Sequence, residues 1–188
     1  MKDMFVLKSE ICLFDKVEDF LEKENVCEDD LIITNRFIFD GKYKTSAHLI
    51  FQEEYGKGEP TDVMVESIRK DIPSSIKRII AIGGGTVIDI SKFLILDYDG
   101  KIDQVINREI PFNKIRSLYV VPTTVGTGSE VTNVAICEMI ERKTKKGLAD
   151  DLIYPDKAAL IPELVKTLPY KFFATSSIDA LIHSIESF

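Results

Sequence analysis

The stretch RIIAIGGGTVIDISK, residues 78–92, determines the fold of the chain. Its apolar and β-branched first part, residues 79–82, has the composition of a short strand that is buried on both faces. Three glycines follow, and after them Val87, Ile90 and Leu94 recur at helical spacing. The stretch therefore predicts a strand, a glycine loop and a helix, which together open a parallel βαβ unit.

The glycine loop, GGGT at residues 83–86, is a candidate cofactor site. Glycines let the backbone turn sharply and approach a ligand closely, and the N–H groups of a helix N-terminus attract an anion such as a pyrophosphate. The loop matches neither the GxGxxG dinucleotide fingerprint nor a P-loop, which needs a Gly-Lys-Ser/Thr ending. A tight turn with Thr86 as the helix N-cap is the alternative interpretation.

Composition excludes several classes of protein. The 188 residues suffice for one large domain, or for one domain and the beginning of another, and the hydrophobic share of 45% is that of a globular protein. No apolar run approaches the roughly 20 residues that span a bilayer, and the N-terminus lacks a signal-peptide core, so we expect a cytoplasmic protein. Three scattered cysteines without CxxC spacing indicate reduced thiols. A net charge of −7 argues against a nucleic-acid partner.

Strand and helix patterns alternate along the chain. Predicted strands cover residues 5–8, 11–14, 30–35, 48–52 and 117–121, and residues 131–139 and 145–152 are expected to form a hairpin. Predicted helices cover residues 17–23, residues 40–46 and a segment capped by Thr61, with Val63, Met64, Val65 and Ile68 on its apolar side. A strand and a short helix are expected within residues 155–168, and a last helix from residue 170 onward. This alternation predicts an α/β protein with a parallel sheet.

A second candidate site is the polar loop PTTVGTGSEVTN at residues 122–133. It comes directly after a predicted strand, where open α/β sheets place their ligands. Its small side chains leave room for a bound molecule, and Thr123, Thr124, Thr127 and Ser129 offer donors and acceptors without charge. An ordinary glycine and threonine loop is the alternative, although so long a polar loop is unusual without a function.

Asp179 and His183 lie four residues apart in the last predicted helix and therefore on one helical face. A carboxylate and an imidazole at this spacing can chelate a divalent metal. Two ligands are too few for a tight site, so a simple Asp–His contact within the helix is the alternative. His48, at the start of a predicted strand, has no partner at ligand spacing and is interpreted as structural.

Three motifs, GGGTVIDISK, VPTTVGTGSEVTN and SSIDALIHSIESF, occur in this order and resemble those of the iron-containing (group III) alcohol dehydrogenases. The segments YGKGEPTD, TKKGLA and LPYKFFATSSIDALIHSIE are most similar to the branch that interconverts 4-hydroxybutyrate and succinic semialdehyde. The resemblance implies a Rossmann-like dinucleotide-binding domain over residues 1–168, with a parallel sheet, flanking helices and an N-terminal β arm that pairs across a homodimer. It also implies that residues 169–188 begin an all-helical metal-binding domain.

The resemblance also implies roles for individual residues. The cofactor-binding positions are Asn35, Gly84, Gly85, Thr86, Asp89, Thr123, Thr124, Thr127 and Lys145. Asp179 and His183 are the expected metal ligands, with Fe²⁺ as the first choice of metal and Zn²⁺ or Mn²⁺ as alternatives. No residue is assigned as the catalytic acid or base. The expected substrate is a small alcohol or aldehyde.

Two departures from the family pattern matter. Asn35, followed by Arg36, stands where many members carry an aspartate that binds the adenosine ribose. An amide no longer repels a 2′-phosphate and Arg36 could attract one, so NAD is predicted with NADP as the alternative. The family's two further metal-binding histidines are absent, so we expect this chain to be the N-terminal half of an enzyme and to have little or no activity alone.

Other functions stay open at this point. The enzyme could act on another small primary alcohol or on a polyol. Dehydroquinate synthase and glycerol dehydrogenase share the glycine loop, but they usually lack the complete TTxGTGSEVT segment that this chain carries. A nucleotide-binding fragment without catalysis is an alternative of a different class.

Overall fold

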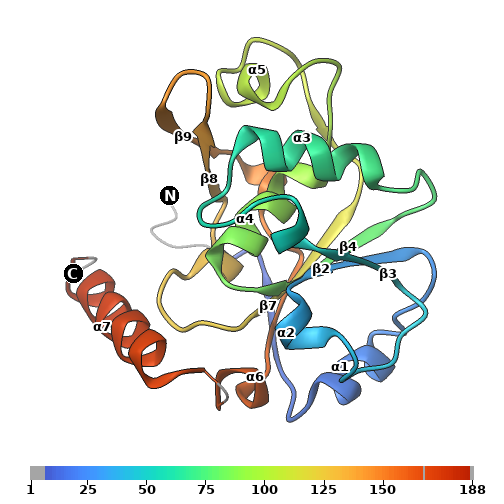
Figure 1. Cartoon of the computed structure of the whole chain (residues 1–188), viewed down its shortest axis with the longest axis vertical. Helices are drawn as coiled ribbons and strands as arrows, with labels where there is room; N and C mark the ends of the chain where they lie inside the picture. Colours follow the sequence, from blue (N-terminus) through green and yellow to red (C-terminus); the bar gives the residue numbers. More distant parts are fainter. Residues whose placement is uncertain (1–6, 167, 187–188) are drawn as a thin grey trace, which may run out of the picture.

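The computed structural model describes residues 7–166 and 168–186. Its centre is a six-stranded sheet in which every pair of neighbouring strands is parallel (Figure 1). The strand order is β1 (Glu10–Leu13), β10 (Lys157–Leu160), β7 (Ser117–Pro122), β4 (Arg78–Gly83), β2 (Asp30–Thr34) and β3 (His48–Phe51). The predicted α/β fold with a parallel sheet is therefore confirmed.

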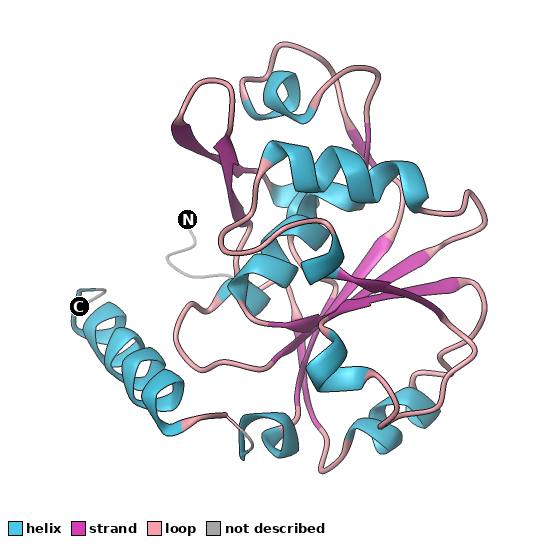
Figure 2. Cartoon of the chain, viewed as in Figure 1, coloured by secondary structure: helices cyan, strands magenta, loops and turns pink. Residues whose placement is uncertain are grey.

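Helices cover both faces of this sheet, because alternate residues of each strand point to opposite faces (Figure 2). In β4, Ile79 and Ala81 belong to one core, while Ile80 and Ile82 belong to the other. The first core is closed by α3 (Asp62–Asp71), α4 (Gly85–Leu94), α5 (Ile102–Ile106) and the hairpin of β8 (Val134–Met139) and β9 (Thr144–Ala149). The second is closed by α1 (Val17–Lys23), α2 (Arg36–Phe39) and α6 (Pro162–Lys166).

The remaining elements are short, except for α7 (Tyr170–Glu186). They are β5 (Leu96–Asp97), β6 (Asn113–Lys114) and the 3₁₀ turns η1 (Gln52–Glu54), η2 (Ser129–Val131) and η3 (Asp151–Ile153). Helix α7 lies to one side of the domain, with its apolar residues largely exposed (Figure 1). None of the helices in the described parts of the chain has the length and apolar character that a membrane crossing requires.

Four local predictions are wrong. The helix expected at residues 40–46 is α2, which begins directly after the extended Asn35 and ends before Gly41, whose φ is +69°. Val63 is 54% exposed, because it points away from the buried side of α3. Gly84 rather than Thr86 is the N-cap residue of α4. The strand predicted at residues 11–14 is confirmed as β1, but the separate N-terminal arm is wrong, because β1 pairs with β10 at the edge of the main sheet. The strand predicted at residues 5–8 lies mostly outside the described residues.

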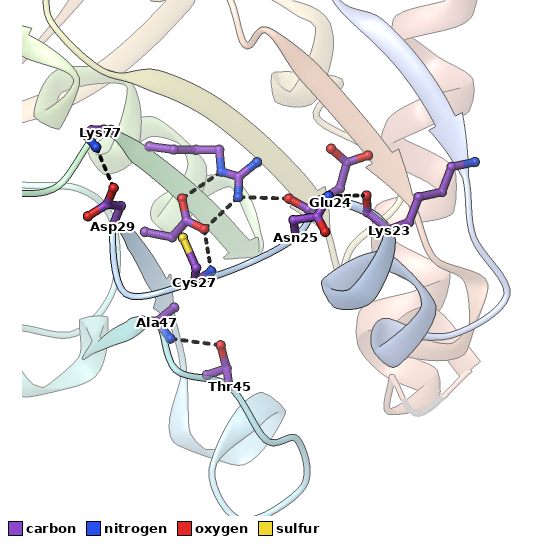
Figure 3. Close-up of polar contacts among 10 residues, drawn as sticks. Lys23, Glu24, Asn25, Cys27, Asp29, Thr45, Ala47 and Lys77 are labelled. Carbon is purple, nitrogen blue, oxygen red and sulfur yellow. Dashed lines mark hydrogen bonds and ion pairs between the residues drawn. The ribbon is translucent and has the colours of Figure 1, made fainter.

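Polar contacts tie together the amino-terminal ends of β2 and β4, where Asp30 pairs in register with Arg78. The guanidinium of Arg78 donates from Nε to Oδ1 of Asp30 (2.8 Å) and from Nη2 to Oδ2 (2.6 Å), and the backbone N–H of Cys27 also donates to Oδ2. Next to this buried pair, Lys77 and Asp29 form an exposed ion pair (Figure 3). The opposite, carboxyl-terminal ends of the strands carry the glycine and threonine loops.

Candidate functional site

The glycine loop and the threonine loop lie side by side at the carboxyl-terminal edge of the sheet. Strands β4 and β7 are neighbours, with Gly83 in register with Pro122, and the backbone N–H of Thr123 donates to the carbonyl of Gly83 (3.0 Å). Strand β3 lies on one side of β2 and β4 on the other, so the direction of winding reverses between β2 and β4. Open α/β sheets bind ligands at such a switch point.

Contacts between the two loops are made by small groups. A Cβ added to Gly84 would lie 3.5 Å from Cγ2 of Thr124, and one added to Gly85 would lie 3.6 Å from Cγ2 of Thr127. Helix α4 begins at Gly85, so its free N–H groups open between the loops. The hydroxyl of Thr86 donates to the carbonyl of Gly58 (3.0 Å), which ties the loop before α3 to the start of α4.

Two cavities meet at Thr124, which lines both. The first, of about 560 Å³, is lined by Asn35, Gly84 and Thr123, with Phe172 from α7. The second, of about 860 Å³, is lined by Thr127, Gly126 and His183, among others. Both volumes are in the range of ligand sites. Asn35 therefore lines the first cavity and His183 the second, and Thr124 of the threonine loop lies between them. We refer to these two neighbouring cavities together as the path.

Asp89 and Lys92 lie on the side of α4 that faces the β8–β9 hairpin, and neither lines the two cavities. Oδ2 of Asp89 accepts from the backbone N–H of Ile136 (3.0 Å), and burial raises the pKa of this carboxyl. The fully buried Lys92 donates to the carbonyl of Val134 (2.7 Å) and to the hydroxyl of Thr132 (3.2 Å). Burial lowers its pKa to about 8. These side chains hold the hairpin and the end of the threonine loop against α4.

Lys145 lies on β9, with its side chain exposed and ion-paired with Glu59. Glu59 follows Gly58, whose carbonyl accepts the Thr86 hydroxyl. The structure therefore places Lys145 at the rim of the glycine loop, with Glu59 as the link. The motif alone gave no sign of this partner, because the two residues belong to separate elements.

Asn35 directly follows β2, and its surroundings contain carboxylates that the sequence alone did not indicate. Its Nδ2 donates to Oε2 of Glu53 (2.8 Å), and the backbone N–H of Arg36 donates to Oε1 of the same carboxylate (2.7 Å). The Arg36 guanidinium pairs with Glu54 and with Asp40. The acidic pair EE directly after the strand predicted at residues 48–52 was the available signal.

Asp179 and His183 are neighbours on α7, with half-exposed side chains and 3.7 Å between Oδ1 and Nε2. The threonine loop reaches this helix at Gly126, where an added Cβ would lie 3.1 Å from Oδ2 of Asp179. The oxygen and nitrogen donors suit a divalent metal such as iron or zinc. Within the described residues, no group of three or more histidines, cysteines or carboxylates could hold a metal, so the pair supplies at most part of a site.

Comparisons with known proteins agree with this geometry. The family model "iron-containing alcohol dehydrogenase" matches residues 13–162. A 4-hydroxybutyrate dehydrogenase from Clostridium kluyveri is 47% identical over 186 residues, which are 97% of this chain and 50% of that protein. A sulfoacetaldehyde reductase from Bilophila wadsworthia is 35% identical over 112 residues, 58% of this chain and 29% of that protein. The chain spans about half the length of the first of these curated relatives.

Solved structures match in fold. A sulfoacetaldehyde reductase from Bifidobacterium kashiwanohense, determined in complex with NAD⁺, superimposes with a TM-score of 0.82 at 24% identity over 100% of this chain and 54% of that one. The NADH-dependent butanol dehydrogenase A of Thermotoga maritima gives a TM-score of 0.79 at 19% identity, over 98% of this chain and 50% of that one.

Proposed function

Because this chain belongs to the iron-containing alcohol dehydrogenase family, as its motifs predicted, we propose that it forms the nucleotide-binding half of an oxidoreductase. The proposed enzyme uses NAD(H) and a divalent metal and interconverts 4-hydroxybutyrate and succinic semialdehyde. The observation that carries the proposal is the pair of cavities that share Thr124, with Asn35 and Gly84 lining the first and His183 lining the second. The relative of 47% identity that is named for this reaction supports the choice of substrate.

The residues in and around these two cavities have side chains and backbone groups that suit different parts of a dinucleotide. Gly84 and Gly85 leave space at the N-terminus of α4 for a pyrophosphate, which the helix N–H groups attract. Thr123, Thr124 and Thr127 offer hydroxyls that orient the ribose and nicotinamide without adding charge. Asn35 binds the adenosine ribose, and Lys145, ion-paired with Glu59, is a cation at the rim of the glycine loop.

Asp179 and His183 hold the metal in this proposal, together with ligands from outside the described residues. When bound, NADH would supply the hydride and the metal would polarise the substrate oxygen as a Lewis acid. Gly126 brings the threonine loop against Asp179, so the nicotinamide and metal sides of the path are adjacent. No residue in the described parts of the chain is assigned as the group that transfers the proton. The homodimer, the cytoplasmic location and the domain boundary at residue 168 stay predictions.

Calorimetric titration of the 188-residue chain tests the proposal. We expect NADH to bind at one site per chain, Zn²⁺ or anaerobic Fe²⁺ to bind weakly, and no turnover to occur. A chain that folds but binds no dinucleotide would contradict the proposal. In the natural protein that carries this sequence, NADH oxidation should be faster with succinic semialdehyde than with butanal, and the reverse order would overturn the substrate assignment.

Nucleotide binding without catalysis is the second candidate, favoured by the two-ligand metal pair in the described residues. The same assay distinguishes it. A natural protein that binds NADH and no metal, and reduces neither aldehyde, would support this second candidate.

A further inference from the structure

The amide of Asn35 is held in one orientation by its neighbours. Because Thr34 of β2 is in register with Phe51 of β3, the residues that follow the two strands come together. Nε2 of the buried Gln52 donates to the carbonyl of Gly56 (3.0 Å), so its Oε1 faces Asn35 and accepts from Nδ2 at 3.5 Å. The second N–H of Nδ2 donates to Glu53. Both amide hydrogens are therefore in use, and Oδ1 is left to serve a ligand in the first cavity.

Glu53 supplies a fixed negative charge beside this cavity. Burial raises the pKa of its carboxyl, but the hydrogen bonds from the backbone N–H of Arg36 and from Asn35 outweigh burial, and the pKa lies below its ordinary value. Both carboxylate oxygens accept hydrogen bonds, at 2.7 and 2.8 Å, so the group is ionised and immobile at neutral pH.

Arg36, the residue that could attract a 2′-phosphate, is already engaged. Its guanidinium pairs with Asp40 at 3.0 Å and with Glu54, and it stacks on the ring of Phe51, 4.2 Å from the centroid. Two carboxylates pair with its single charge, while the carboxylate of Glu53 accepts its hydrogen bonds from neutral N–H groups. Lys42 and Glu163 also line the first cavity, with opposite charges, and the Nζ of Lys42 donates to the carbonyl of Phe37 (2.6 Å). The charged side chains around this end of the cavity therefore have a net negative formal charge.

We infer that Glu53 makes this site selective for NAD(H) over NADP(H), by orienting Asn35 and by repelling a 2′-phosphate. The inference rests on the proposed function. Oδ1 of Asn35 accepts a hydrogen bond from the ribose 2′-hydroxyl, as the aspartate of a typical dinucleotide site does. A 2′-phosphate has acceptor oxygens only and would meet an acceptor and a negative charge. Asn35 and Glu53 together thus replace one aspartate, with the charge contributed by η1, the turn that follows the neighbouring strand β3.

The test is the ratio of NADPH to NADH dissociation constants, measured from the fluorescence of the reduced nicotinamide with the full chain. We expect the unsubstituted chain to prefer NADH by at least about tenfold. In Glu53→Gln, the amide that replaces the carboxylate carries an N–H group, and this group would face one of the two N–H donors, that of Asn35 or that of Arg36. The Asn35 amide is therefore expected to turn and to present Nδ2 to the cavity. The preference should fall about tenfold, mainly through tighter NADPH binding. Glu22→Gln, the same charge change at an exposed position of α1, should leave the ratio unchanged.

Arg36→Ala provides a second test if Glu53→Gln fails to fold. Because the guanidinium is compensated, its loss should change the ratio less than threefold, and a large loss of NADPH binding would overturn the inference. A chain that binds NADH with a ratio unaffected by Glu53→Gln would overturn the inference alone. A chain that binds neither dinucleotide would overturn the proposed function as well.

Discussion

Gly126 of the threonine loop lies directly against Asp179 of α7. A Cβ at this glycine would be 3.1 Å from Oδ2 of Asp179 and 2.7 Å from the backbone oxygen of Ser176. Real Cβ atoms essentially never approach a backbone oxygen as closely as 2.7 Å, so any side chain would push the loop and the helix apart. This glycine therefore fixes the distance between the proposed nicotinamide and metal sides of the path.

We expect Gly126→Ala to loosen α7. Amide hydrogen exchange around Ser176 should become about tenfold faster, because the helix loses its close contact with the loop. Gly147→Ala is the matched control: its added Cβ would lie 3.5 Å from the carbonyl of Ala135, an ordinary contact, and exchange in α7 should not change. Equal exchange in the two variants would show that the loop does not hold the helix.

We expect alanine substitutions at two positions of the glycine loop, Gly83 and Gly84, to have different effects. A Cβ on Gly83 would lie 2.7 Å from Cβ of Val87, so Gly83→Ala should lower the free energy of unfolding by about 1–3 kcal/mol through overpacking. Gly84 has an ordinary φ of −81° and room for a Cβ. Gly84→Ala should therefore keep its stability but bind NADH at least about tenfold more weakly, because the methyl group fills the proposed phosphate space.

Urea unfolding followed by circular dichroism, together with NADH titration, checks both glycine variants. Unchanged NADH binding by a stable Gly84→Ala chain would contradict a pyrophosphate site at this glycine.

Local patterns were sufficient for most of the fold. The apolar run at residues 79–82 and the periodicity after it correctly placed β4 and α4, since burial on both faces and helical spacing are properties of the sequence itself. The position of α2 was missed, because an extended Asn35 and the positive φ of Gly41 fix its ends, and neither residue type requires that conformation. Motif order correctly brought the glycine and threonine loops together.

Contacts between distant elements could not be predicted in the same way. Glu53 reaches Asn35 only because β2 and β3 are parallel neighbours that end at the same level. Helical spacing put Asp89 and Lys92 on α4 but gave no indication that this side of the helix meets a hairpin. A lysine with no exposed surface is also contrary to the usual rule that lysines are exposed.

The buried Lys92 should make stability depend on alkaline pH. Its folded pKa is about 8, below the ordinary 10.5, so between these values the unfolded chain binds a proton that the folded chain has released. The free energy of unfolding therefore gains a contribution that rises with pH above about 8 and is constant below it. Relative to neutral pH, this contribution should reach about 2 kcal/mol near pH 9.5.

Lys92→Met provides the comparison, because it removes the titrating group. Urea unfolding at about pH 7 and about pH 9.5 should show the unsubstituted chain gaining stability relative to the variant. Taking the difference removes the contributions of other groups, such as Cys137. Burial raises the pKa of its thiol to about 12, so in this pH range the thiol titrates only in the unfolded chain. Parallel pH profiles of the two chains would show that Lys92 does not release its proton in this range.

We expect the adjacent basic residues Lys77 and Arg78, where β4 begins, to contribute very unequally to the free energy of unfolding. The side chains of Arg78 and Asp30 are only 16% and 4% exposed, and the guanidinium makes two hydrogen bonds to the carboxylate. Arg78→Met leaves the buried carboxylate without its cation, so the free energy of unfolding should fall by about 3–5 kcal/mol. Lys77→Met removes the same charge from the adjacent pair, where Lys77 is 76% exposed, and should have little effect. Urea unfolding of the two variants side by side measures the difference; equal losses would mean that the Arg78–Asp30 pair is no more important than a surface ion pair.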